Sequence, residues 1–269
     1  MPDRGGADLS GPGDWDARTY DRISDPMTRW GRDVLARLVV GRGATVLDAG
    51  CGTGRVTEML LETVVDGRVV ALDAAPSMLS EARRRLARFG DRVSFAAADL
   101  LDLAPGILGG WAPVDAVLST ATFHWVLDHD RLFANLAGVL RPGGQLVAQC
   151  GAAGNIARLM AAVRTTGMER TGAWFYASPE ETRRRLEESG FTEIEVWTHP
   201  EPTPIDPAEL ATYLETVCLR TLVAPMAPEE RTRFLGAVAE ALGEPVIDYV
   251  RLNIVARRGG DETEAGATG

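Results

Sequence analysis

The stretch Val46-Leu47-Asp48-Ala49-Gly50-Cys51-Gly52-Thr53-Gly54 decides the fold of this chain. The apolar run at 44–47 predicts a buried strand, and it is followed by an acidic residue and by three glycines at every second position. After the last glycine the apolar residues recur with a helical period, at Val56, Met59, Leu60, Leu61 and Val64. Glycines allow a tight turn and let a ligand approach backbone atoms that a Cβ would block. We predict the first strand–turn–helix unit of a nucleotide-binding α/β sheet.

The spacing of the glycines distinguishes two kinds of nucleotide loop. A dinucleotide fingerprint, G-x-G-x-x-G, would place its third glycine at position 55, which is Arg55. The third glycine is Gly54 instead, so the pattern is G-x-G-x-G after Asp48. A glycine turn with only a structural role would give the same pattern.

Two further acidic residues follow predicted strands. Residues 68–73 read as a strand that ends in Asp73, about 20 residues beyond the glycines, which is the spacing at which a carboxylate reaches ribose hydroxyls. A carboxylate accepts two hydrogen bonds from a vicinal diol, so we predict Asp73 as the ribose anchor. Asp99 follows the next strand, at 93–96.

Composition limits the possible functions. The chain has 269 residues and an apolar fraction of 45%, enough for one α/β domain with an elaboration. The net charge of −10 disfavours a nucleic-acid partner, and all 28 basic residues are arginine, which excludes a lysine base or Schiff base. We expect no membrane span and no signal peptide, hence a cytoplasmic protein. The spacing of the cysteines and histidines predicts no metal site.

The remaining elements complete the expected architecture. Further strands are predicted at 114–119, 145–150, 191–198 and 250–256, a helix at 33–39 and a loop at 103–113. We predict a Rossmann-like, seven-stranded, mostly parallel sheet with helices on both faces. Residues 1–14 and 259–269 are predicted to be disordered, and 15–258 to form a single domain. An insertion at about 200–245 carries two helical patterns, and we expect a helical cap over the substrate side.

The segment after the strand at 114–119 should line the reaction site, because active sites of open parallel sheets lie at the carboxyl ends of strands. It contains His124 and Trp125. A histidine could act as a base toward a phenol, alcohol or amine, could hydrogen-bond to substrate, or could pack beside Trp125. Trp125, Trp174 and Tyr176 are predicted to line the pocket, with a role in the core as the alternative.

These motifs together resemble the class I S-adenosylmethionine-dependent methyltransferases, and more closely the trans-aconitate methyltransferase family. The glycine loop is similar to motif I of that class, and the turn at 140–144 to its Leu-Arg-Pro-Gly-Gly turn. The segments 123–129 and 251–258 are similar to the family, and the resemblance covers roughly 15–258. Thr53, Thr120 and His124 stand where the family commonly has Pro, Asn and Gln.

The resemblance implies S-adenosylmethionine as the cofactor. It implies that Asp99 faces the adenine amino group with Leu100 against the ring, and that Tyr20 and Trp30 close over the cofactor unless they pack against the sheet. Met78 would pack on the ribose or the adenine. The predicted cofactor-binding residues are Tyr20, Trp30, Asp48, Ala49, Gly50, Cys51, Gly52, Gly54, Asp73, Ala74, Met78, Asp99, Leu100, Ser119 and Thr120.

The implied activity is O-methylation of a small carboxylic acid similar to trans-aconitate. A carboxylate is ionised at pH 7 and needs no base, and Arg220 on the expected cap is the predicted carboxylate clamp, since guanidinium matches a carboxylate bidentately. The predicted substrate-binding residues are His124, Trp125, Trp174, Tyr176 and Arg220. The alternatives are methylation of a phenolic or amine natural product, a nicotinamide (NAD) oxidoreductase, and a non-catalytic cofactor-binding protein. The sequence leaves the oligomeric state open.

Overall fold

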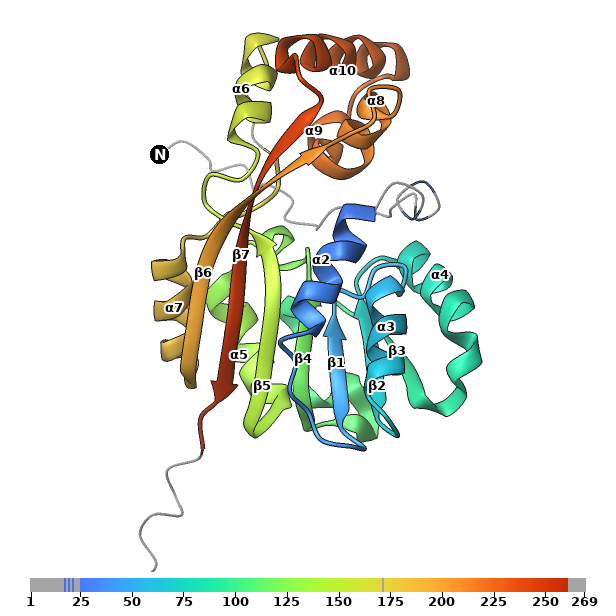
Figure 1. Cartoon of the computed structure of the whole chain (residues 1–269), viewed down its shortest axis with the longest axis vertical. Coiled ribbons are helices and arrows are strands. Elements are labelled where there is room, and N and C mark those ends of the chain that lie inside the picture. The colour runs from blue at the N-terminus through green and yellow to red at the C-terminus, as the bar shows by residue number, and fades with distance from the viewer. Residues whose placement is uncertain (1–16, 18, 20, 22–24, 171, 261–269) are drawn as a thin grey trace, which may run out of the picture.

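The computed structural model describes residues 17, 19, 21, 25–170 and 172–260, so the predictions for residues 1–14, Tyr20 and the tail beyond 260 lie outside it. Seven strands form one sheet in the order β3-β2-β1-β4-β5-β7-β6 (Figure 1). Neighbouring strands from β1 to β5 are parallel, and β7 runs antiparallel to both β5 and β6. The strands are β1 Thr45–Ala49, β2 Arg68–Asp73, β3 Val93–Ala97, β4 Val114–Thr120, β5 Leu140–Gly151, β6 Phe191–Pro204 and β7 Val246–Arg258. The predicted Rossmann-like, mostly parallel sheet is confirmed.

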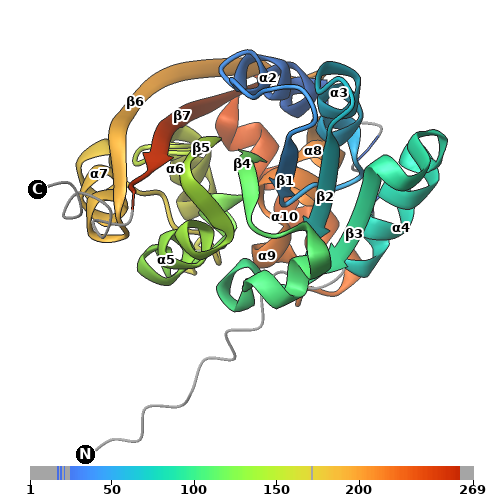
Figure 2. The same cartoon turned by 90° about the horizontal axis from the view of Figure 1, so that it is seen from below.

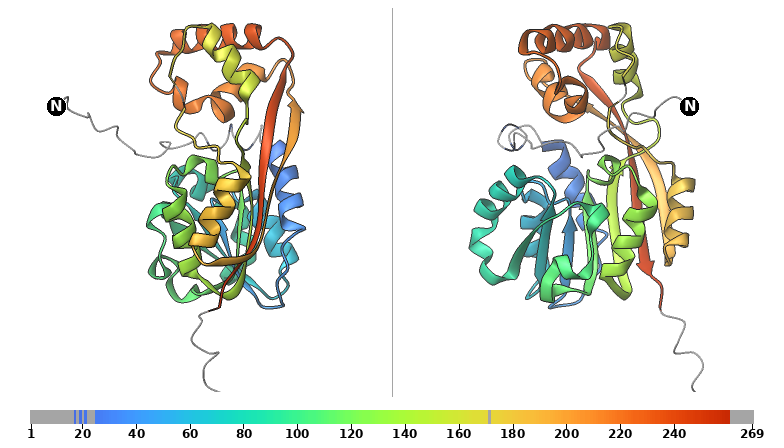
Figure 3. Two further views of the ribbon diagram at one scale, coloured as in Figure 1. Left: turned by 90° about the vertical axis from the view of Figure 1, so that its left-hand side faces the viewer. Right: turned by 180° about the vertical axis from the view of Figure 1, so that it is seen from behind.

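Helices cover both faces of the sheet (Figures 2 and 3). One face carries α2 Asp25–Leu35, α3 Arg55–Thr63 and α4 Pro76–Leu86, and the other carries α5 His129–Val139 and α7 Pro179–Glu188 with the short 3-10 helices η2 Leu100–Asp102 and η3 Pro105–Trp111. Alternate side chains of one strand enter different cores: Val70 packs in the core that contains α5, and Val69 in the core that contains α3. Burial on both faces explains why the strands read as apolar runs and not as an alternation.

A third apolar core lies beyond the carboxyl ends of the parallel strands (Figure 1). Between β6 and β7 the chain forms α8 Leu210–Tyr213, the π-helix η5 Leu214–Cys218, α9 Arg220–Val223 and α10 Pro228–Leu242. These helices pack with α6 Ala157–Thr165, which follows β5, and with Met27 and Trp30 of α2. In the described ranges, none of the helices has the length and apolarity that a membrane span requires.

Helix α2 begins at Asp25, earlier than the predicted start at residue 33. A proline fits the first turn of a helix because its missing N–H has no partner there, and Pro26 lies in the first turn of α2. Gly31 does not break the helix. A Cβ at Gly31 would lie 2.4 Å from Val56 Cγ2, so this glycine allows α2 to pack closely on α3.

Strand β6 continues to Pro204, past the predicted end at residue 198, and β7 begins at Val246 instead of residue 250. The insertion therefore spans 205–245. The prolines of β6 alternate, at 200, 202 and 204, and pair opposite β7 as far as Val246. Because β6 is an edge strand, each proline nitrogen can point away from its only neighbour, and no ladder hydrogen bond is lost. The predicted loop at 103–113 contains the 3-10 helix η3.

The turn after β1 requires glycine for two reasons. Gly50 has a φ of +84°, and its N–H and that of Cys51 both donate to the carbonyl of Leu72, at 2.8 and 2.9 Å. A Cβ at Gly50 would lie 2.2 Å from Thr122 Oγ1. The turn is thus held against both β2 and the segment that leaves β4.

We expect Gly50→Ala to destabilise the protein far more than Gly43→Ala. Both glycines have positive φ, but a Cβ at Gly43 meets nothing within 4 Å. Gly43→Ala should cost about 1 kcal/mol of unfolding free energy from backbone strain alone, and Gly50→Ala should cost roughly 2 kcal/mol more from the clash. Urea unfolding without cofactor measures both, and equal losses would show that the close approach to Thr122 is unimportant.

Candidate active site

The glycine loop and the end of β2 are joined through Asp73. The N–H of Gly52 donates to Asp73 Oδ2 at 2.9 Å, and the N–H of Ala75 donates to Oδ1 at 2.8 Å. Burial raises the pKa of this carboxyl group, and the backbone hydrogen bonds oppose that rise. Each carboxylate oxygen has a further lone pair. A Cβ at Gly52 would meet nothing within 4 Å, so the loop borders open space.

Asp48 lies beneath the same loop. Its side chain is 2% exposed and accepts a hydrogen bond from Thr57 Oγ1 at 2.6 Å. Burial raises its pKa to about 7, the hydrogen bond from Thr57 opposes this, and the negative charge of Asp73 adds to it. Near neutral pH this carboxyl group is therefore balanced between its neutral and its charged form.

The other predicted cofactor residues follow the carboxyl ends of the strands. Asp99 is exposed after β3, accepts a hydrogen bond from the N–H of Leu101 at 2.8 Å, and precedes the buried Leu100. Met78 is buried against Ala75. The remaining predicted residues differ in exposure: Ala49, Cys51 and Ser119 are buried, and Ala74 is exposed. Ser119 Oγ donates to the carbonyl of Ala49 at 2.7 Å.

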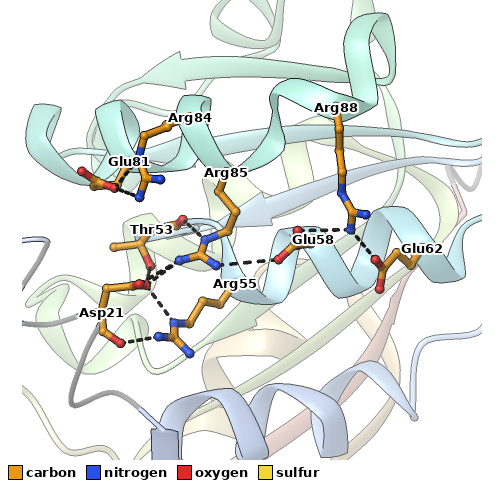
Figure 4. A network of polar contacts seen from close by, with 9 residues as sticks. All are labelled: Asp21, Thr53, Arg55, Glu58, Glu62, Glu81, Arg84, Arg85 and Arg88. Atoms are coloured by element: carbon orange, nitrogen blue, oxygen red, sulfur yellow. Dashed lines mark hydrogen bonds and ion pairs between the residues drawn. The ribbon is translucent and has the colours of Figure 1, made fainter.

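Asp21, which precedes α2, forms hydrogen bonds to the glycine loop and to residues of α3 and α4 (Figure 4). The Asp21 carboxylate accepts hydrogen bonds from Thr53 Oγ1 at 2.7 Å, from Arg55 Nε at 2.8 Å and from Arg85 of α4 at 2.8 Å. Burial alone would raise the pKa of Asp21, but the hydrogen bonds from Arg55 and Thr53 and the charges of Arg85 and Arg55 lower it. Four residues earlier, Ala17 packs against Ala75 and Met78.

A cavity lies beside this loop, between the sheet and the helical insertion. The space between its lining atoms, together with the part that is open to solvent, is about 470 Å³. Its apolar lining is Met27, Trp30, Ala121, Trp125, Ile156 and Val217, and its polar lining is His124, Asn155, Tyr176, Cys218, Tyr249 and Arg251. The segment that leaves β4 connects cavity and loop: Ala121 and His124 line the cavity, while Thr122 Oγ1 donates to the carbonyl of Gly50 at 3.3 Å.

Arg251 is the charged group of this cavity. Its side chain belongs to the inner strand β7 and is 2% exposed. Its Nε donates to Gln149 Oε1 at 3.3 Å, and its guanidinium carbon lies 4.1 Å from the centre of the Trp30 ring. Within the described residues, Arg251 Nη2 is buried without a hydrogen-bond partner, and no carboxylate forms an ion pair with this guanidinium.

His124 is held as a neutral imidazole. Burial lowers its pKa well below the usual value, and the positive charge of Arg251 lowers it further. The N–H of Gly151 donates to His124 Nδ1 at 3.4 Å, which assigns the ring proton to Nε2. In this tautomer His124 offers the cavity a hydrogen-bond donor.

Comparison with known proteins agrees with this arrangement. Residues 46–144 match a methyltransferase domain. Over 267 residues the chain is 31% identical to trans-aconitate 2-methyltransferase of Methylobacterium radiotolerans, covering 91% of this chain and 98% of that protein. It is 32% identical to the protein of the same name from Methylobacterium nodulans, with the same coverage. The chain belongs to the trans-aconitate methyltransferase family. It is an S-adenosylmethionine-dependent methyltransferase.

Solved structures share the fold of this methyltransferase. A phosphoethanolamine N-methyltransferase of Haemonchus contortus, in complex with phosphomonomethylethanolamine and S-adenosylhomocysteine, has a TM-score of 0.60 at 17% identity and covers 91% of this chain and 57% of its own. A putative sarcosine dimethylglycine methyltransferase of Galdieria sulphuraria has a TM-score of 0.55 at 18% identity and covers 95% of each chain.

The loop fits the cofactor of the family. The open space at Gly52 lies beside Asp73, whose carboxylate can accept hydrogen bonds from a ribose diol. Asp48 supplies a buried carboxyl group that a positively charged ligand would ionise. These are the residues that would hold S-adenosylmethionine in this methyltransferase.

The structure brings most of the predicted substrate residues together. Trp125, Tyr176 and His124 line the cavity, and Trp174 stacks on Tyr176 with ring centres 6.0 Å apart. Trp30, predicted on the cofactor side, also lines this cavity. Arg220 of α9 is not among the described residues that line it, so its carboxylate role remains a prediction.

Sequence reasoning missed Arg251, the cation of the cavity, and Asp21, which fastens the segment before α2. The signal for Arg251 was present, because an arginine and an asparagine interrupt the apolar run of the last strand. A polar side chain that is buried in an inner strand must find its partner inside the protein. No comparable signal marks Asp21, because its partners are brought to it by α3 and α4.

We expect the affinity for S-adenosylmethionine to rise with pH between 6 and 8. A pKa of about 7 means that Asp48 is mostly neutral at pH 6 and mostly charged at pH 8, and only the charged form attracts the cationic cofactor. Titration calorimetry should show the Kd falling by about tenfold over this range. Asp48→Asn should flatten the pH profile, whereas Asp99→Asn should weaken binding and keep the slope. A slope that survives Asp48→Asn would refute this role.

We expect Asp21→Asn to speed release of S-adenosylmethionine by roughly threefold to tenfold, because partly buried ion pairs of this kind contribute about 1 kcal/mol. Glu62→Gln is the matched control, since it removes only an exposed ion pair with Arg88 on the neighbouring surface (Figure 4). Stopped-flow displacement by S-adenosylhomocysteine measures both variants. Equal rates in the two variants would show that Asp21 does not secure the loop.

Proposed function

We propose that this methyltransferase esterifies a small carboxylic acid and that Arg251 binds the carboxylate. What supports this most is a fully buried guanidinium with no carboxylate partner among the described residues. A buried cation that lacks a counter-ion lowers the free energy of unfolding by several kcal/mol. An anionic ligand in the cavity would offset that cost, and guanidinium pairs bidentately with a carboxylate.

Two other side chains around the cavity favour a ligand whose atoms accept hydrogen bonds. Trp30 Nε1 is also buried without a partner in the described part of the chain, and it can only donate. His124 offers its Nε2 proton, because Nδ1 accepts from Gly151. Three side chains that line one cavity thus present N–H donors, and the oxygens of a carboxylate are acceptors only when ionised.

For this reaction the protein has to bind and orient the carboxylic acid, and it does not have to transfer a proton. A carboxylate is already ionised at pH 7. When bound, S-adenosylmethionine supplies an electrophilic methyl group, which a carboxylate oxygen accepts through a new C–O bond while the C–S bonding pair returns to sulfur. The residues of the chain hold the acid: Arg251 neutralises it, and His124 and Trp30 fix its oxygens. Orientation of the two reactants is the main source of rate.

The alternative acceptors are phenols and amines, which would need a base. His124 is the candidate for that role, but burial and the charge of Arg251 lower its pKa, and both effects oppose proton uptake. Membership of the methyltransferase family removes the nicotinamide oxidoreductase and the non-catalytic binding protein from the alternatives.

We expect Arg251→Met to reduce kcat/KM for carboxylic acids by about 100-fold or more, since loss of one partner of a buried charge pair costs 2–5 kcal/mol. The Kd for S-adenosylmethionine should stay within about twofold, because the cavity lies beside the glycine loop and does not include it. Arg220→Ala is the control and should change kcat/KM by less than about threefold. The assay is transfer of labelled methyl groups to a panel of small acids, phenols and amines that includes trans-aconitate.

Base-labile label on acids would establish carboxyl methylation. Label on phenols or amines alone would overturn the proposal and return His124 to the role of base. A large effect of Arg220→Ala with none of Arg251→Met would reassign the clamp to α9.

A further inference from the structure

The described lining of the cavity around Arg251 contains a single formal charge. Among the described residues that line it, Arg251 alone carries a formal charge. The other basic side chain is His124, which is neutral, and no aspartate, glutamate or second arginine lines the cavity. Among these lining residues, Arg251 is therefore the one ion-pair partner for a ligand inside the cavity.

Three of the polar lining residues already have partners within the protein. Tyr249 Oη lies 2.8 Å from Tyr213 Oη and 3.4 Å from Cys218 Sγ. Asn155 Oδ1 accepts from the N–H of Val250 at 2.9 Å. These bonds occupy the Tyr249 hydroxyl, the Cys218 thiol and the Asn155 carbonyl oxygen, so less of their hydrogen-bonding capacity is left for a ligand.

Half of the lining residues are apolar, and two of these, Ala121 and Ile156, have a positive φ. Ile156 is 1% exposed and has a φ of +51°, a conformation that a β-branched residue rarely adopts. Its N–H donates to the carbonyl of Asp248 at 3.1 Å, which holds it in place. Strain of this kind is retained where the surrounding structure imposes it, most often at ligand sites. Here it places the sec-butyl side chain of Ile156 beside Met27, Trp30 and Val217.

We propose that the acceptor of this methyltransferase is a monocarboxylic acid with an apolar body, and not a tricarboxylate. This inference rests on the proposed function, because it describes the remainder of an acid whose carboxylate binds Arg251. Trans-aconitate, named in the relatives, carries three carboxylates. One would pair with Arg251, and the other two would be desolvated against apolar and aromatic side chains, with no second cation among the described lining residues to receive them.

The test compares acids that differ by one carboxylate. The pairs are trans-2-hexenoate with trans-2-hexenedioate and cinnamate with 4-carboxycinnamate, with trans-aconitate as a fifth substrate. The intact enzyme with S-adenosylmethionine should show kcat/KM at least tenfold higher for the monocarboxylate of each pair, equivalent to about 1.4 kcal/mol. Base-labile ester should be the product.

A charge-altered variant sharpens the test. Val217→Arg adds a second cation to the apolar lining, and we expect it to reduce or reverse the preference within each pair. Val217→Gln is the matched control of similar length without charge, and it should keep the preference. Binding of each acid in the presence of S-adenosylhomocysteine gives the same ranking without turnover.

The outcomes separate this inference from the proposed function. If acids are esterified but the dicarboxylates or trans-aconitate equal or exceed the monocarboxylates, the inference is overturned and the proposed function stands. If none of the five acids binds or is esterified while S-adenosylmethionine binds, both are overturned. A preference for monocarboxylates that Val217→Arg diminishes supports both.

Discussion

The position of β7 inside the sheet constrains the chemistry of this protein. Both edges of β7 are paired and residues 251–254 are buried, so the polar side chains in this part of the strand must find partners within the fold. Asn253 of β7 does so fully: its Oδ1 accepts from Gln149 at 3.0 Å and from Arg37 at 2.7 Å, and its Nδ2 lies 3.0 Å from His199 Nδ1. Arg251, two residues earlier, donates one hydrogen bond to Gln149 and lies against the ring of Trp30. The buried polar atom of β7 that lacks a hydrogen-bond partner among the described residues, Arg251 Nη2, thus belongs to a residue that lines the cavity.

One short segment divides the site into two halves. After β4 the chain turns at Ala121, with a φ of +56°, and Thr122 then bonds to the turn at Gly50. On one side of this segment are the glycine loop and the carboxylates Asp48 and Asp73. On the other side is the cavity, lined by Ala121 and His124. A shift of the segment would alter both halves, which explains why glycine at 50 is needed for close packing as well as for its backbone conformation.

The fold and the cavity depend on different parts of the chain. Solved methyltransferases that are named for other acceptors share the fold of this chain. The cavity is formed by side chains from α2, the segment after β4, the start of α6, η5 and β7. The segment after β4 bonds to the glycine loop through Thr122, whereas the lining side chains of η5 and β7 can change without altering that bond. Acceptor preference can therefore vary while the cofactor remains the same.

The sequence by itself determined the fold class and the cofactor of this protein. Strand, glycine turn and helix follow from local backbone preferences and apolar periodicity, and the acidic residues at 48, 73 and 99 mark the ends of successive strands. The extent of β6 was missed because proline is tolerated on an edge strand, and only the strand order shows which strand is at the edge.

Only the tertiary structure decided which arginine lies at the cavity. Sequence reasoning selected Arg220 on the expected cap, whereas Arg251 is the arginine that lines the cavity. Whether an arginine is buried and unpaired depends on neighbours brought together from distant parts of the chain, here Trp30, Gln149 and Tyr249. Local patterns set backbone conformation, but the environment of a charge is a property of the folded chain.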